Sequence, residues 1–145
     1  MNVLALHQKL YVASRGLLGH RLLGIPTLLL TATGRRSGQQ RVSALVYGRN
    51  GGDYLVVASN GGAPTAPGWS HNLAAHPHAS IQVGTRTVEV DASFVYPGEP
   101  TFAELWEIVN AANKQRFRGY EKSTTRPIPV VVLTPSRHAR SAGNS

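Results

Sequence analysis

The stretch TATGRRSGQQRVSALV, residues 31–46, joins two apolar runs through a turn that holds three arginines and two glycines. The run PTLLLTATG before the turn (26–34) predicts a buried strand, and RVSALVYG after it (41–48) predicts a second strand. Two strands joined by a short Gly-containing connection pair most simply as an antiparallel hairpin. The sequence therefore predicts a hairpin that carries Arg35, Arg36 and Arg41 around its turn.

Further strands follow on both sides of glycine-rich turns. The triplet Asn50-Gly51-Gly52 is a strong hairpin signal before DYLVVAS (53–59), so we expect the sheet to grow as a meander. The segments ASIQVG (79–84) and TRTVEVDASFVY (85–96) alternate around Gly84 as another antiparallel pair, and IPVVVL (128–133) predicts a last buried strand.

Three segments are expected to be helical, the first and the third from the spacing of their apolar residues. We expect a short amphipathic helix within residues 3–12, a second one capped by Ser70 that ends before His76, and a third over residues 101–112 with Trp106 packed into the core. Five or six antiparallel strands with two or three helices favour an α+β domain built on a small β-barrel. We divide the chain into a helical segment (1–24), the barrel (25–135) and a flexible tail (136–145).

Length and composition limit the function classes. A chain of 145 residues with 41% hydrophobic and 15% charged residues is typical of one globular domain. Without cysteine it has no disulfides and no thiolate chemistry, which fits a cytoplasmic protein, and its apolar runs are far shorter than a membrane span. The net charge of +8 favours an anionic partner: nucleic acid, a phosphorylated cofactor or an acidic membrane surface.

Two of the alternative partners receive little support from the motifs. The chain lacks lysine-rich tracts and the aromatic and basic stripe that stacks bases on a sheet, so we expect no nucleic acid. Its six histidines are scattered without a helical ligand pair, so we expect no metal site.

The GRRSG turn (34–38) has the groups needed to bind a phosphate or a carboxylate. It offers two guanidiniums, one hydroxyl and backbone N–H groups freed by glycine, although a solvated basic turn is the alternative interpretation. In a barrel, the SNGG loop (59–62) and the pair Trp69 and Asn72 would share a cleft with this turn. That combination suits a phosphorylated cofactor that contains an aromatic ring.

The series TGRRSGQ (33–39), ASNGG (58–62), PGWSHNL (67–73), HP (76–77) and IPVVV (128–132) occurs in this order along the chain. In residues 20–134 the sequence resembles the deazaflavin-dependent nitroreductases of actinobacteria. The resemblance implies a split β-barrel of the flavin-reductase and pyridoxamine-oxidase type. It also implies coenzyme F-420 as the cofactor, a deazaflavin with an anionic tail that carries a phosphodiester and oligoglutamate.

The resemblance assigns roles to individual residues. Arg35, Arg36, Ser37, Gly38 and Arg41 are expected to hold the phosphate and tail, and Val46, Ala58, Ser59, Asn60, Trp69 and Asn72 to lie along the deazaflavin ring. Phe117 and Tyr120 are expected over the substrate, with Tyr120 and Ser59 as catalytic residues and Tyr120 as a hydrogen-bond or proton donor. Three positions depart from the family pattern: Arg36 and Asn60 replace common lysines, and Phe117 replaces a tyrosine.

The implied reaction is hydride transfer from reduced coenzyme F-420 to an electron-poor acceptor such as a quinone, an enone or a nitroaromatic. The alternatives are a carrier that binds the cofactor without turnover and a flavin mononucleotide reductase. The N-terminal helix either packs on the barrel, caps the cleft or docks on anionic lipid, where it would meet lipid-soluble quinones. A monomer and a homodimer both fit the sequence.

Overall fold

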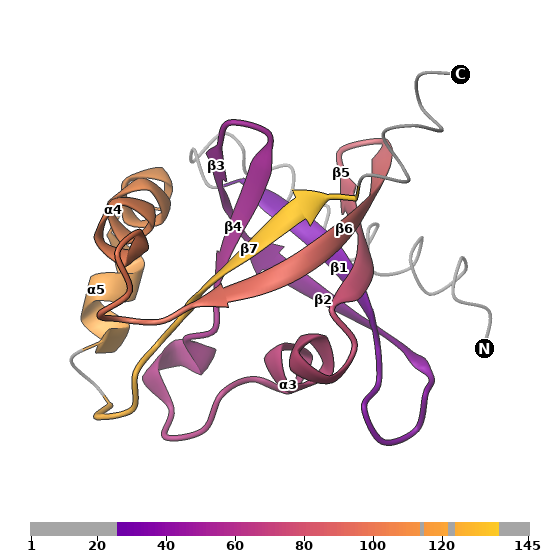
Figure 1. Cartoon of the computed structure of the whole chain (residues 1–145), viewed down its shortest axis with the longest axis horizontal. Helices are drawn as coiled ribbons and strands as arrows, with labels where there is room; N and C mark the ends of the chain where they lie inside the picture. The colour runs from indigo at the N-terminus through magenta and orange to yellow at the C-terminus, as the bar shows by residue number, and fades with distance from the viewer. Residues whose placement is uncertain (1–25, 114, 122–123, 137–145) are drawn as a thin grey trace.

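The structure is a computed structural model that describes residues 26–113, 115–121 and 124–136. Its strands are β1 (Thr27–Thr33), β2 (Gln40–Val46), β3 (Gly48–Asn50), β4 (Asp53–Val57), β5 (His78–Val83), β6 (Arg86–Val95) and β7 (Val130–Pro135). Its helices are the 3-10 turn η2 (Asn60–Gly62) and the α-helices α3 (Gly68–Ala75), α4 (Phe102–Ala112) and α5 (Arg116–Glu121). Figure 1 shows a strongly curled sheet with α4 and α5 on one side and α3 across one end.

All seven strands belong to one antiparallel sheet in the order β2-β1-β5-β6-β7-β4-β3. The hairpin at Asn50-Gly51-Gly52 is confirmed, because β3 pairs with β4, but the expected meander is wrong, because among the described strands β2 pairs only with β1 and lies at the opposite end of the strand order from β3. Only Tyr47 separates β2 and β3 in the chain. The sheet thus curls until its two ends are joined by one residue, which confirms the α+β class and the split β-barrel.

Tyr47 is held firmly at this junction. Its backbone N–H donates to the carbonyl of Pro26 at 3.1 Å, and its carbonyl accepts from Asn113 Nδ2 at 3.3 Å. Its ring packs against Tyr54 with centroids 5.7 Å apart. A side-chain methyl group at the next residue, Gly48, would come within 3.2 Å of the Val109 Cα atom, so glycine permits β3 to lie close to α4.

Two apolar clusters stabilise the domain. The first fills the curled sheet and includes Leu28, Leu30, Ile81, Val90 and Leu133. The second lies between the sheet and helices α4 and α5; it includes Leu55, Trp106, Val109, Phe117 and Val130. The expected core position of Trp106 is confirmed, with its ring stacked on Phe102 at 5.4 Å and 6% of the residue exposed.

Helices α3 and α4 were predicted, with one correction to the start of α3, whereas α5 (Arg116–Glu121) was not predicted. Helix α4 ends at Ala112 as expected, and α3 ends before His76. Ser70 does not cap α3, because the helix begins two residues earlier and Ser70 Oγ donates to the carbonyl of Pro67 at 2.8 Å. The earlier start follows from Pro67, whose fixed φ angle suits a helix N-terminus.

The expected segments at the two ends are only partly within the described residues. Residues 1–24, with the predicted N-terminal helix, lie outside them. Ser136, which we assigned to the tail, is buried and donates its backbone N–H to the carbonyl of Glu89 at 2.8 Å. Ser136 therefore packs against β6 (Arg86–Val95), and the division between barrel and tail stays a prediction. No helix within the described ranges is long and apolar enough to cross a membrane.

Candidate functional site

The arginine turn between β1 and β2, residues 34–39, is shaped by its own backbone. The N–H of Gly34 donates to the carbonyl of Gln39 at 2.7 Å, and that of Gly38 donates to the carbonyl of Gly34 at 2.9 Å. Gly38 has a φ angle of 71°, which is favourable for glycine, and Ser37 Oγ accepts from the N–H of Gln39 at 3.1 Å. Ser37 and Gly38 thus close the turn and leave the arginine side chains on its outside.

Arg35 fixes the turn to helix α3. Its backbone N–H and its Nη1 atom both donate to Asn72 Oδ1, each at 3.1 Å. Asn72 is buried, with 7% of the residue exposed, so its amide oxygen requires hydrogen-bond partners, and Arg35 supplies two. Two of the predicted site motifs, TGRRSGQ and PGWSHNL, therefore meet in the folded chain.

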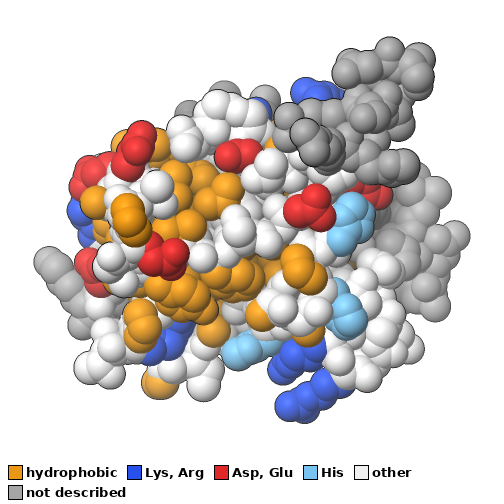
Figure 2. All heavy atoms as spheres, viewed as in Figure 1, with side chains coloured by type: hydrophobic (Ala, Val, Ile, Leu, Met, Phe, Trp, Pro, Cys, Tyr) orange, Lys and Arg blue, Asp and Glu red, His pale blue; other side chains and the backbone are white. Residues whose placement is uncertain are grey.

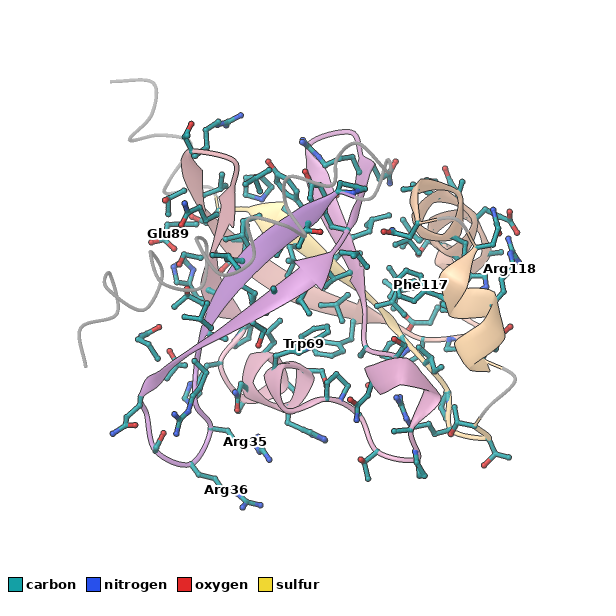
Figure 3. The ribbon with its side chains drawn as sticks, turned by 180° about the vertical axis from the view of Figure 1, so that it is seen from behind. Arg35, Arg36, Trp69, Glu89, Phe117 and Arg118 are labelled. Carbon is teal, nitrogen blue, oxygen red and sulfur yellow. The ribbon has the colours of Figure 1, made fainter. Side chains whose placement is uncertain are left out.

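Arg36 and Arg41 are exposed, and the structure gives them no carboxylate partner among the residues it describes. The described ion pairs lie elsewhere, joining His78 to two carboxylates and Arg118 to Glu107. Figure 3 shows the side chains of Arg35 and Arg36 at the outer end of the β1–β2 hairpin. Cations without nearby carboxylates attract an anionic group, so this end of the barrel is suited to a phosphate or carboxylate.

Trp69 is the aromatic residue of α3, the helix that Arg35 contacts through Asn72. It is half-buried in the first turn of α3 and packs against the apolar cluster inside the sheet. Because Trp69 and Asn72 are three residues apart on a helix, they share one face. In the view of Figure 3, Trp69 lies between Arg35 and Phe117.

The loop after β4 carries three more predicted residues. Ala58 and Ser59 are buried, and the N–H of Ala58 donates to the carbonyl of Pro129 at 3.3 Å. Asn60 is exposed, has a left-handed φ angle of 47°, and donates from Nδ2 to the carbonyl of Thr65 at 3.0 Å. The remaining predicted ring residue, Val46, lies apart at the end of β2 and packs against the second apolar cluster.

Arg126, which was not predicted from the sequence, lies against this loop. Its Nε atom donates to the carbonyl of Ala63 at 3.0 Å, and its Nη2 atom donates to the carbonyls of Ala58 and Ser59 at 3.0 and 2.7 Å. Arg126 precedes Pro127 in a segment without a recognisable motif, and its partners lie more than 60 residues away. The only local signal was an isolated arginine before a proline.

Helix α5 carries the two predicted substrate residues and contacts the η2 turn. Phe117 is 3% exposed and its ring packs against Trp106, with centroids 6.5 Å apart. In this arrangement Phe117 belongs to the second core cluster. The structure describes the backbone of Tyr120 in α5 but not its side chain, so its role stays a prediction.

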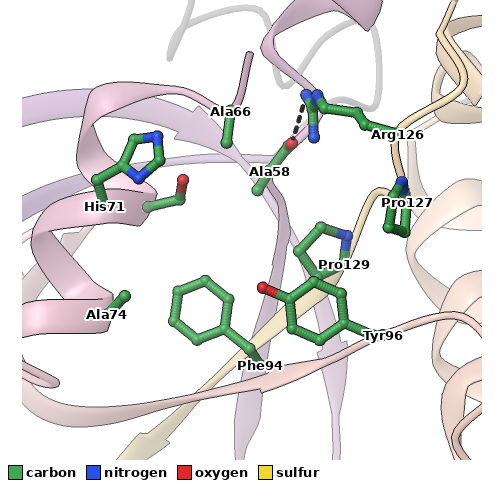
Figure 4. Close-up of a pocket in the computed structure, with 10 residues that line it drawn as sticks. Ala58, Ala66, His71, Ala74, Phe94, Tyr96, Arg126, Pro127 and Pro129 are labelled. Carbon is green, nitrogen blue, oxygen red and sulfur yellow. Dashed lines mark hydrogen bonds between the residues drawn. The ribbon is translucent and has the colours of Figure 1, made fainter. Parts of the chain in front are cut away.

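A small cavity of about 160 Å³ lies between α3, β6 and the segment before β7. Ser70, His71 and Ala74 line it from α3. Figure 4 shows His71 and Ala74 opposite Phe94 and Tyr96, with Arg126 at one side. The rings of Phe94 and Tyr96 stack with centroids 6.4 Å apart. Figure 2, drawn in the same view as Figure 1, shows apolar side chains gathered on the face of the molecule that is turned towards the viewer. Within the described residues no cluster of His, Asp and Glu could hold a metal ion.

These donors fit an anionic cofactor with a planar ring. The arginine turn supplies exposed cations, α3 supplies an indole, and the hydrogen bond between Arg35 and Asn72 keeps the two adjacent. The loop at residues 58–60 adds small and polar groups at the end of β4. Separate sites for anion and ring on rigid elements are typical of sites for phosphorylated cofactors.

Comparisons with known proteins agree on one family. Residues 4–135 match the model of the family described as F420H(2)-dependent quinone reductase. An F420H(2)-dependent quinone reductase of Mycobacterium tuberculosis is 47% identical over 135 residues, which are 92% of this chain and 91% of that protein.

Two solved structures are similar in both sequence and fold. One titled as an F420-H2 dependent reductase is 33% identical, has a TM-score of 0.66, and is aligned over 74% of this chain and 93% of that one. Another, titled as a domain-swapped dimer, has the same identity and TM-score over 74% of this chain and 79% of that one.

Proposed function

This chain belongs to the F420H(2)-dependent quinone reductase family, and from that premise we propose that it transfers a hydride from reduced coenzyme F-420 to a quinone. Family membership identifies the chain as an oxidoreductase that depends on coenzyme F-420. The observation that carries the proposal is the double hydrogen bond from Arg35 to Asn72, because it joins the anion-binding turn to the helix with Trp69.

We propose that the arginine turn binds the anionic tail and that the barrel end beside Trp69 binds the deazaflavin ring. Arg36 and Arg41 are free to turn towards a phosphate, since they are exposed and no described carboxylate pairs with them. Arg35 is oriented by Asn72. When bound, the reduced cofactor supplies the hydride.

The other proposed roles concern the acceptor. Ser59 is buried at the end of β4, where its hydroxyl can orient a ring or an acceptor oxygen. Tyr120 lies on α5, which contacts the η2 turn, and we propose that its hydroxyl donates the proton that a reduced quinone oxygen needs. Nitroaromatics and enones remain predicted acceptors. Their reduction also requires a group that orients the acceptor and a group that donates a proton.

The test is a fluorescence titration of the purified full chain with coenzyme F-420, with flavin mononucleotide as the parallel ligand. We expect selective binding of coenzyme F-420 and loss of affinity in the double variant with Arg35→Ala and Arg36→Ala. Preference for flavin mononucleotide would contradict the proposal. Turnover of a soluble quinone with the reduced cofactor separates an enzyme from a carrier, because a carrier binds without oxidising it.

The assembly is a further part of the proposal. We propose a homodimer because a structure with 33% identity is titled as a domain-swapped dimer. Light scattering on the purified chain measures its mass in solution, and a monomer at all concentrations would contradict the homodimer. The cytoplasmic location and the lipid contact of the N-terminal helix stay predictions, and that helix lies outside the described residues.

A further inference from the structure

Arg126 is bound to the loop that follows β4 at three points. One guanidinium donates to the carbonyls of Ala58, Ser59 and Ala63 at distances of 2.7 to 3.0 Å. These carbonyls lie at the beginning and the end of the η2 turn, so a single side chain spans it. The fork of donors in arginine is suited to such a geometry, because several N–H groups in one plane reach separate acceptors.

The loop also contacts α5, and Asn60 Nδ2 donates to the carbonyl of Thr65 at 3.0 Å. Within the described residues, the N–H of Gly62 donates to the carbonyl of Ser59 at 2.8 Å, and the N–H of Ala63 to that of Asn60 at 3.1 Å. Asn60 and Gly62 have φ angles of 47° and 83°. Asparagine tolerates the left-handed conformation better than most residues with a side chain, and Arg126 adds hydrogen bonds on both sides of this turn.

Arg126 is itself well fixed. Its N–H donates to Thr124 Oγ1 at 3.3 Å, and two residues beyond Pro127 the carbonyl of Pro129 accepts from the N–H of Ala58. The segment before β7 therefore contacts the loop twice, once through a side chain and once through the backbone. Figure 4 shows the guanidinium of Arg126 at the carbonyl of Ala58.

We propose that Arg126 is a positioning residue that sets the conformation of the loop of Ala58, Ser59 and Asn60, and through it the affinity for coenzyme F-420. The inference rests on the proposed function, in which this loop lies along the deazaflavin ring. Arg126 acts through backbone carbonyls, and its guanidinium need not touch the cofactor. Without it, the carbonyls of the buried residues Ala58 and Ser59 lose a charged donor, so the loop shifts or admits water.

The experiment compares the variants R126M and R126K with the control R49M in the full chain. Arg49 is a matched control because its guanidinium also donates to backbone carbonyls, those of Asp53 and Gly51 at 3.3 and 3.4 Å. It supports the β3–β4 hairpin at the other end of β4 (Figure 1). Each variant is measured by fluorescence titration with coenzyme F-420, thermal unfolding, and hydrogen exchange of the peptide that covers residues 58–66.

In R126M we expect the Kd for coenzyme F-420 to rise about tenfold and the loop peptide to exchange faster, because the carbonyls lose their donor. In R126K we expect a smaller rise, of about threefold, since an ammonium retains the charge but not the planar fork. In R49M we expect a Kd within about twofold of the wild type, because its contacts lie away from the loop.

The outcomes separate this inference from the proposed function. Failure of the wild-type chain to bind coenzyme F-420 overturns the proposed function and this inference with it. Wild-type binding together with an unchanged Kd in R126M overturns the inference alone, as does an equal loss of affinity in R49M. If R126M does not fold, R126K decides: a raised Kd at an unchanged melting temperature supports the inference, and an unchanged Kd overturns it.

Discussion

Asn72 Oδ1 accepts two hydrogen bonds from Arg35, one from the backbone N–H and one from Nη1, across 37 residues of chain. The first bond fixes where the turn lies, and the second fixes where its guanidinium points. One buried amide thus determines both the position and the direction of a cationic group. The cation-bearing turn and the indole of α3 consequently form one unit.

We expect Asn72→Ala to weaken binding of coenzyme F-420 about tenfold and to lower the free energy of unfolding by about 1–3 kcal/mol, because two donors of Arg35 lose their acceptor. Fluorescence titration and denaturant unfolding measure the two effects. Asn72→Asp is the variant to compare with Asn72→Ala, because a carboxylate still accepts both hydrogen bonds from Arg35 but neutralises its guanidinium. It should retain stability and lose affinity; retained affinity would mean that Arg35 only supports the turn.

Arg36→Ala and Arg41→Ala should each weaken cofactor binding about fivefold, or roughly 1 kcal/mol for an exposed ionic contact. Neither should change the melting temperature, since both side chains are exposed. The affinity of the wild type should fall with rising salt, and less steeply in each variant. Arg86→Ala is the control, because this exposed arginine begins β6 at the opposite end of the sheet from the arginine turn (Figure 1). An equal loss in the control would contradict a specific anion site.

Trp106→Phe should yield a protein whose fluorescence reports on the site, because the chain has two tryptophans and Trp106 lies in the second core cluster. The remaining emission comes from Trp69, and we expect bound coenzyme F-420 to quench it. Trp69→Ala should weaken binding about tenfold, measured by the fluorescence of the cofactor, since stacking of a base on an aromatic side chain contributes about 1–3 kcal/mol. Emission that does not respond to a saturating cofactor concentration would place the ring away from Trp69.

Tyr120→Phe should lower kcat for quinone reduction about 100-fold and leave the Kd for the cofactor unchanged, as expected for loss of a general acid. Ser59→Ala tests the second predicted catalytic residue in the same assay. If kcat is unchanged in Tyr120→Phe, the proton comes from another group or from water.

Phe117→Leu should lower the free energy of unfolding by about 1–2 kcal/mol, because the side chain is buried against Trp106. Because the side chain of Phe117 is buried in the core, we expect the KM for the quinone in this variant to stay within twofold of the wild type. A larger change in KM with normal stability would support the role over the substrate that the family resemblance implies.

The parts of the fold that depend on local signals were predictable. The glycine turns, the alternation in β5 and β6 and the apolar spacing of α4 each depend on a few adjacent residues, and their bounds agree with the structure. The strand order was not predictable in this way. Pairing of β1 with β5 and of β4 with β7 joins segments about 50 and 75 residues apart, for which periodicity gives no information.

In the candidate site, too, the features that depend on adjacent residues were predictable and the contacts between distant segments were not. The cationic turn and its glycines were visible in one short motif, whereas the bond from Arg35 to Asn72 depends on how α3 packs. Arg126 could not be found because its partners are backbone carbonyls, which every residue possesses. Helix α5 was not predicted, and the burial of Phe117 depends on how this helix packs on Trp106.

The hairpin between β3 and β4 has a practical use. Gly51 and Gly52 are exposed, and a side-chain methyl group built on either would meet no atom within 4 Å. The hairpin is also at the far end of β4 from the loop of Ala58, Ser59 and Asn60. A peptide tag, a dye or a surface linker inserted between these two glycines would leave the barrel and its predicted cofactor end intact, so the domain could be immobilised as a deazaflavin sensor.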